Sequence, residues 1–184
     1  MLESLQEDDI LERLNQQLDI HGLLVTAMDI IGQNVDQLIM KAFRKDKHAI
    51  KFVIPSLVGN RGPLNELSVR LKLLYALGVI SREEYEDIEL IMAIVDELEL
   101  DDETVYTFVD DEILGPISLL HDMTLPPQII SQKIIPNEAG IVDSIKSSIY
   151  KQRYQQMIRS ALIIAITTLV VRLSEKQCLL FMHQ

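Results

Sequence analysis

The sequence has a single cysteine, Cys178, no long apolar run, and few basic residues beside its many acids. One thiol excludes an internal disulfide and a thiolate metal cage built from one chain, which favours a reducing compartment. The longest apolar stretch, 161–171, is too short for a helix that must span a bilayer with about 20 residues, so we expect a buried core helix there. The acidic segment Met1–Asp9 lacks the basic start of a signal peptide, and we therefore expect a cytoplasmic protein.

Basic residues are scarce overall, because 17 Lys and Arg stand against 28 Asp and Glu, giving a formal net charge of −11. A field of this sign repels polyphosphate and disfavours nonspecific nucleic-acid binding. The acids are concentrated between Ser81 and Glu112, whereas residues 41–72 carry an excess of Lys and Arg. This dipolar distribution would suit self-association or the steering of a partner, although solvated helix faces would produce it too.

No segment has the alternating pattern of a β-strand, and apolar residues recur instead at helical spacing. This spacing predicts helices from Ser4 to about Gln17, from Ile20 to Phe43, and over 49–57, 64–77 and 81–98, the last two forming an αα-hairpin. A loop over 101–107, a short helix over 110–120 and an irregular Pro-containing excursion at about 121–137 should follow. The last helix, from about Glu138 to Leu180, is apolar all round in its middle. We expect an all-α, single-domain multi-helix bundle over 1–184 with a long central C-terminal helix.

The sequence offers no catalytic, cofactor-binding or metal-binding constellation. Its four histidines are far apart and lack a second ligand at helical spacing, and the only clustered glycines, Gly59 and Gly62, precede no lysine. The acids of 81–98 should lie opposite the apolar stripe of their helix and point at water. An enzyme would instead need an inward-facing carboxylate cluster, so surface positions for Glu83, Asp87 and Glu89 would remove that hypothesis.

Ordered segments along the chain resemble the mannitol operon repressor family of bacteria. They are Phe-Arg-Lys-Asp at 43–46, Gly-Pro-Leu at 62–64, Leu-Ser-Val-Arg-Leu-Lys-Leu at 67–73, Gly-Val-Ile at 78–80, Tyr-Glu-Asp at 85–87, Asp-Asp-Glu-Ile-Leu-Gly-Pro at 110–116 and Gln-Arg-Tyr-Gln-Gln at 152–156. The likeness covers roughly residues 10–172, and residues 123–142 and the C-terminal tail depart from it. It implies negative regulation of mannitol uptake and oxidation genes by an all-helical protein without a recognised DNA-binding motif, a catalytic motif or a cofactor.

Our first hypothesis is a transcriptional co-repressor that binds another transcription regulator or a component of the sugar phosphotransferase system, and that forms a homodimer through apolar helix faces. A basic partner would meet an acidic face with an apolar anchor, made of Glu83, Glu86, Asp87, Glu89, Asp110, Asp111, Glu112 and Leu114. The alternative is a repressor that contacts DNA directly through the basic cluster Lys41, Arg44, Lys45, Lys47 and Lys51. Residues 64–98 could be mistaken for a helix-turn-helix, whose second helix would enter the major groove of DNA. This second helix is strongly acidic, and the DNA phosphates would repel it.

Overall fold

The computed structural model describes residues 7–43, 49–59, 62–101, 104–127 and 140–182, and no β-strand occurs among them. Its elements in chain order are α1 (Glu7–Asn15), α2 (Ile20–Ala42), the π-helix η1 (Ala49–Val53), α3 (Ile54–Val58), α4 (Leu67–Ala76), α5 (Arg82–Leu100), α6 (Asp111–Ile117) and α7 (Gly140–Met182). The all-α prediction is therefore confirmed. Ser4 of the first predicted capping box and residues 128–137 of the predicted excursion lie outside the described residues.

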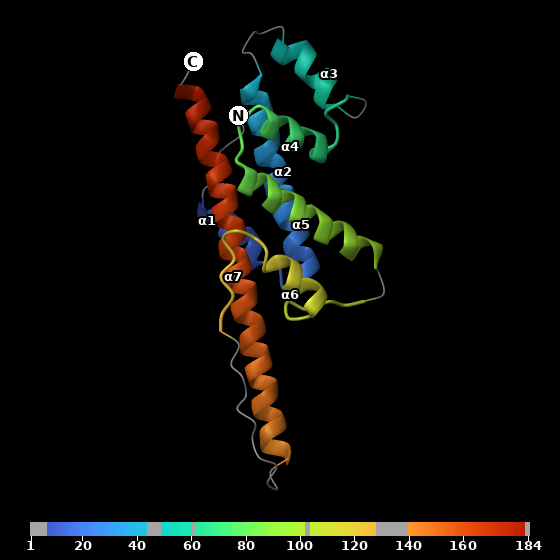
Figure 1. Cartoon of the computed structure of the whole chain (residues 1–184), viewed down its shortest axis with the longest axis vertical. Helices are drawn as coiled ribbons and strands as arrows, with labels where there is room; N and C mark the ends of the chain where they lie inside the picture. The colour runs from blue at the N-terminus through green and yellow to red at the C-terminus, as the bar shows by residue number, and fades with distance from the viewer. Residues whose placement is uncertain (1–6, 44–48, 60–61, 102–103, 128–139, 183–184) are drawn as a thin grey trace.

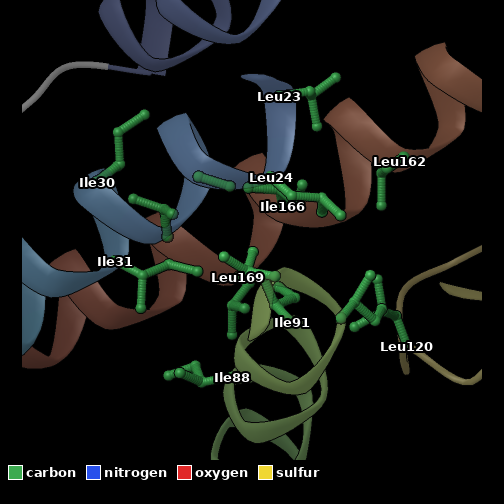
Figure 2. Close-up of a cluster of buried hydrophobic side chains, with 14 of the residues drawn as sticks. Leu23, Leu24, Ile30, Ile31, Ile88, Ile91, Leu120, Leu162, Ile166 and Leu169 are labelled. Atoms are coloured by element: carbon green, nitrogen blue, oxygen red, sulfur yellow. The ribbon is translucent and has the colours of Figure 1, made fainter. Parts of the chain in front are cut away.

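The centre of the molecule is the contact between α2 and α7, and α5 packs against α2 beside it (Figure 1). Figure 2 shows where the three helices meet, in a cluster of buried aliphatic side chains that includes Leu24, Ile31, Ile88, Ile91, Ile166 and Leu169. Each such side chain contributes about 1.5–3 kcal/mol when it leaves water. The apolar spacing in the sequence thus marks the faces that hold these three helices together.

Polar contacts fix α7 against the two N-terminal helices. The Arg159 guanidinium donates to the carbonyls of Asn15 and Gln17, at 2.8 Å each, and so satisfies groups that the end of α1 leaves open. Further along α7, the Ser174 hydroxyl and the Gln177 amide both donate to the Asn34 side-chain oxygen at 2.9 Å. Asn34 is buried in α2, and these bonds give its oxygen the partners that burial requires.

The predicted αα-hairpin is present, with two differences at its first helix. Gly78 has φ +69°, the left-handed conformation that favours glycine, and Ser81 and Glu84 form the predicted capping box at the start of α5. However, α4 begins at Leu67 rather than at residue 64. Leu77 continues the apolar spacing of this helix, which predicts that it is buried, but it is 57% exposed. Leu77 is the C-cap residue of α4, so the helical stripe no longer directs its side chain into the core.

The last helix, α7, was expected to be buried all round in its middle, and this is only partly correct. Between Ser148 and Gln177 it is long and apolar enough to cross a membrane, but half of its most apolar window is buried against the other helices. This burial is typical of a core helix. Ile164, in the middle of the same stretch, is nevertheless 61% exposed, so one face of α7 is open. The N-terminal end of α7 also projects beyond the other helices (Figure 1).

Candidate partner-binding face

The predicted residues lie on α5 and at the start of α6. Asp111 and Glu112 are exposed in the first turn of α6, and Glu83 is exposed in the first turn of α5. Glu86, Glu89 and Asp110 are half-buried, and Leu114 is a half-buried side chain that packs against the core. Of the predicted acids, Glu112 lies beside residues of α5, among them Ala93 and Glu97, whereas Asp87 departs from the prediction.

Asp87 was predicted at the surface, and this is wrong, because only 3% of the residue is exposed. Its carboxylate accepts hydrogen bonds from the backbone N–H of His121 at 3.0 Å and from the ring Nδ1 of His121 at 2.8 Å. Glu84 is buried as well and is paired with Lys176 of α7 at 2.7 Å. These two acids fasten α5 to α7 and to the segment after α6, so they cannot present charge to a partner.

The sequence contained a signal for this burial. Glu84 and Asp87 precede Ile88 and Ile91 by one helical turn each, which places them on the buried stripe of α5. Their cationic and imidazole partners lie far along the chain, at positions 121 and 176, and no local pattern identifies such pairs. The enzyme hypothesis would be removed if Glu83, Asp87 and Glu89 all lay at the surface. Because Asp87 faces inward, this test does not remove it.

His121 is held among carboxylates, and this makes the stability of the fold depend on pH. The hydrogen bond to Asp87 raises the pKa of His121 above its ordinary value of 6.5, and the charges of Asp87, Glu83 and Glu86 act in the same direction. A raised folded-state pKa means that the stabilisation is complete below about pH 6.5 and disappears as the pH rises through the folded pKa.

We therefore expect the free energy of unfolding to fall as the pH increases through the range just above 6.5. Urea titrations across this range, for the native chain and for His121→Gln, would measure the effect. The variant should show a smaller decrease, since it keeps a hydrogen-bond donor but cannot carry charge. Equal slopes for the two proteins would contradict the assignment to His121.

A groove opens between α5 and α6 beside Glu112, one of the predicted acidic residues. It has a volume of about 420 Å³ and is lined by Leu90, Ala93, Ile94, Glu97, Leu98, Tyr106, Glu112, Ile113 and Pro116. Aliphatic side chains form its floor, whereas the carboxylates of Glu97 and Glu112 are exposed at its sides. A helix with an apolar ridge and flanking Lys or Arg side chains has the matching chemistry.

Two tyrosines orient acidic groups of α5 and of the residue that caps its C-terminal end. The Tyr106 hydroxyl donates to Asp101 at 2.8 Å, and this bond raises the pKa of Tyr106. Tyr85 donates to Glu89 and stacks on Tyr75 with ring centroids 4.8 Å apart; the bond to Glu89 raises the pKa of Tyr85 to about 12. Both phenols therefore remain neutral donors at physiological pH and hold their carboxylates in fixed directions.

The alternative basic site is described only in part. Lys41 donates to Gln177 at 3.0 Å, and the exposed Lys51 lies 5.5 Å from the ring centre of Phe52. Arg44, Lys45 and Lys47 fall outside the described residues. Among the residues that the structure describes, no group of three or more His, Cys, Asp or Glu side chains is arranged to hold a metal ion.

Comparison with known proteins gives the same family as the sequence segments. The family model described as mannitol repressor matches residues 6–174. The chain is 42% identical over 172 residues to the mannitol operon repressor of Escherichia coli (strain K12), covering 93% of this chain and 84% of that protein. The X-ray structure of the MtlR–HPr complex from Escherichia coli superimposes with a TM-score of 0.81 at 43% identity, covering 91% of this chain and 98% of that one.

A more distant relative carries an enzyme name. The chain is 28% identical over 179 residues to fumarase E of Escherichia coli (strain K12), covering 93% of this chain and 98% of that protein. This identity is well below the 42% shared with the repressor. The repressor relationship is therefore the stronger guide to the role of this chain.

Proposed function

The chain belongs to the mannitol repressor family, and we propose that it represses mannitol uptake and utilisation genes by binding a phosphotransferase-system protein of the HPr type. The proposed site is the groove between α5 and α6 together with the acidic residues beside it, and the proposed location is the cytoplasm. The single observation that carries the site assignment is an apolar groove with carboxylates at its sides.

The chemistry of the groove supports a protein partner more than DNA. Leu90, Ile94 and Pro116 offer an apolar floor, which desolvated side chains of a partner could cover and which a phosphate backbone could not. Glu97 and Glu112 would attract Lys or Arg side chains and repel phosphates. Direct DNA contact through Lys41 and Lys51 would have to overcome the net charge of −11 and is the weaker alternative.

A catalytic role has less support than binding. Asp87 and His121 resemble an acid–base pair, but the Asp87 carboxylate is already engaged by two hydrogen bonds from His121. The space beside Asp87, lined by Ile91, Leu120 and Leu169 among others, admits no substrate, since its volume is about 0 Å³. We therefore propose a non-enzymatic function.

The decisive experiment is a pair of titrations of the purified chain, one with an HPr-type protein and one with operator DNA, at about 0.15 M salt, where screening extends roughly 8 Å. We expect saturable binding of the protein and none of the DNA. Sequence-dependent binding of the DNA, with no binding of the protein, would overturn the proposal.

The role of the groove carboxylates is tested by the variants Glu97→Lys and Glu12→Lys, which alter the net charge equally. Glu97 lines the groove, whereas Glu12 is an exposed residue of α1. We expect Glu97→Lys to lower the association rate by roughly 3- to 10-fold and to reduce its dependence on salt. Stopped-flow mixing would measure both rates, and an equally large effect of Glu12→Lys would mean that only the overall charge matters.

A further inference from the structure

A polar cavity lies where α7 passes the loop between α1 and α2 and the loop between α5 and α6. It has a volume of about 270 Å³ and is lined by Leu18, Phe108, Gln152, Gln155, Gln156 and Arg159. None of these residues lines the groove between α5 and α6. The volume lies just below the range of about 300–1,000 Å³ that is typical of sites for drug-sized ligands, so the cavity suits a small molecule.

The polar side chains of the cavity all come from one face of α7. They are Gln152, Gln155, Gln156 and Arg159. Each is three, four or seven residues from Gln152, and this spacing places side chains on the same face of a helix. Among the residues that the structure describes, none forms a hydrogen bond with the three glutamine amides.

The three amides match a ligand with several hydroxyl groups. A glutamine amide offers both donors and an acceptor, and a hydroxyl group likewise donates and accepts. Leu18 and Phe108 add apolar surface to the same cavity, which can cover the C–H groups of such a ligand. A few polar groups that converge on an apolar wall are typical of small-molecule sites.

Arg159 brings to the cavity a positive charge that no acid neutralises. Its Nε and Nη2 atoms donate to the backbone carbonyls of Asn15 and Gln17 at 2.8 to 3.2 Å, and these carbonyls carry no net charge. Within the described part of the chain, Arg159 forms no ion pair, and its Nη1 atom has no hydrogen-bond acceptor. The guanidinium is thus held in a fixed direction, with one nitrogen left for an anionic group.

The charges near the cavity favour an anion although the protein is acidic. From Ser144 to Ser174 the sequence contains five Lys or Arg and no acid. No acid lines the cavity, whereas Glu97 and Glu112 line the groove between α5 and α6. A small anion is therefore attracted to the cavity and repelled by the groove. Since Arg159 is the single charged residue of the lining, a ligand with one anionic group matches it best.

We propose that this cavity binds a small polyol that carries one phosphate group. The glutamine amides bond its hydroxyl groups, and Arg159 bonds its phosphate through charge-assisted hydrogen bonds. Because the chain belongs to the mannitol repressor family, D-mannitol 1-phosphate is the probe of this class. The cavity is separate from the partner groove, so ligand binding can be measured whether or not an HPr-type protein binds that groove.

Isothermal titration of the full chain with D-mannitol 1-phosphate, D-mannitol and inorganic phosphate tests the proposal. We expect one saturable site for D-mannitol 1-phosphate, with an affinity at least about 10-fold higher than for either of the other compounds, since each of them lacks one of the two recognised groups. Equal affinity for inorganic phosphate would mean an adventitious ion only, and equal affinity for D-mannitol would mean that Arg159 plays no part. Either result, or the absence of binding, overturns the proposal.

Variants of the glutamines locate the site without disturbing the bonds of Arg159 to α1. Gln152→Leu and Gln155→Leu remove the amide but keep a side chain of similar size, and each should weaken binding of D-mannitol 1-phosphate by roughly 10-fold. The matched control is Gln33→Leu, because Gln33 is an exposed residue of α2 outside the cavity. Unchanged affinity in both cavity variants would place the ligand elsewhere and overturn the proposal.

Arg159→Gln tests the role of the charge. It should reduce the affinity for D-mannitol 1-phosphate to that for D-mannitol, because the phosphate loses its cationic partner. Circular dichroism shows whether this variant remains folded, since the bonds of Arg159 to Asn15 and Gln17 are lost as well. A folded Arg159→Gln variant that still prefers the phosphate would contradict the assignment.

Discussion

Partner binding is expected to fall by roughly 100-fold, or about 2.7 kcal/mol, when Ala93 is replaced by arginine. Ala93 lies on the exposed side of α5 and lines the groove beside Leu90 and Ile94. An arginine side chain there fills the space that a partner helix needs and places a positive charge where we expect the partner to carry its own. The fold should tolerate the change, because the site is exposed and arginine is a good helix former.

The matched control for this variant is Ala76→Arg. Ala76 is an exposed alanine at the end of α4, so the substitution adds the same side chain and the same charge outside the groove. Isothermal titration of both variants with an HPr-type protein measures the difference. Unchanged affinity for Ala93→Arg would show that the partner binds elsewhere and would leave the acidic face without an anchor.

The free energy of unfolding is expected to decrease by about 2–4 kcal/mol when Asp87 is replaced by alanine. The buried carboxylate accepts two hydrogen bonds, from the backbone and the ring of His121. Without it, the backbone N–H of His121 loses its acceptor, and the imidazole loses the group that stabilises its protonated form. A small void also opens beside Ile91 and Leu120.

Urea denaturation compares this variant with Glu83→Ala, which removes another acid from the same helix. Glu83 is 62% exposed and lies 4.0 Å from Arg172, so its loss should cost less than about 1 kcal/mol. The loss in the free energy of unfolding for Asp87→Asn should lie between the losses for these two variants, because an amide oxygen can still accept the backbone hydrogen bond. If Asp87→Ala lowers the free energy of unfolding no more than Glu83→Ala does, the buried pair of Asp87 and His121 contributes little to stability.

The helices could be predicted because their apolar residues repeat at the period of the α-helix, and α2 illustrates this. Its buried apolar residues, from Ile20 to Ile39, are the ones that the spacing selected. The spacing did not select Asn34, which is also buried, and it did select Ala42 and Phe43, which are only half-buried. Leu77 and Asp87 were misplaced for a shared reason. Both predictions used residue type and an idealised helix, whereas the end of α4 and the partner of Asp87 depend on residues elsewhere in the fold.

The acidic composition of the candidate site was evident in the sequence, but its groove was not. Glu97 and Glu112 belong to helices that are separate in the chain, and Tyr106 lies in the loop between them. Only the docking of α6 on α5 brings the three side chains around one apolar floor. Ala93 and Pro116 have no functional group that would indicate a binding site, so the sequence alone could not identify them as groove residues.

The buried acids of α5 have a consequence for how accurately the helices are aligned. Apolar side chains such as Ile88 and Ile91 would find acceptable neighbours if α5 slid along α2, the helix it packs against, by one turn, about 5.4 Å. The same slide would separate Glu84 from Lys176 and Asp87 from His121 and would leave charges buried without partners, which is costly. The two pairs therefore fix the position of α5 along its own axis. They select one alignment among several that hydrophobic packing alone would accept, and they thereby set the position of the groove at the far end of the same helix.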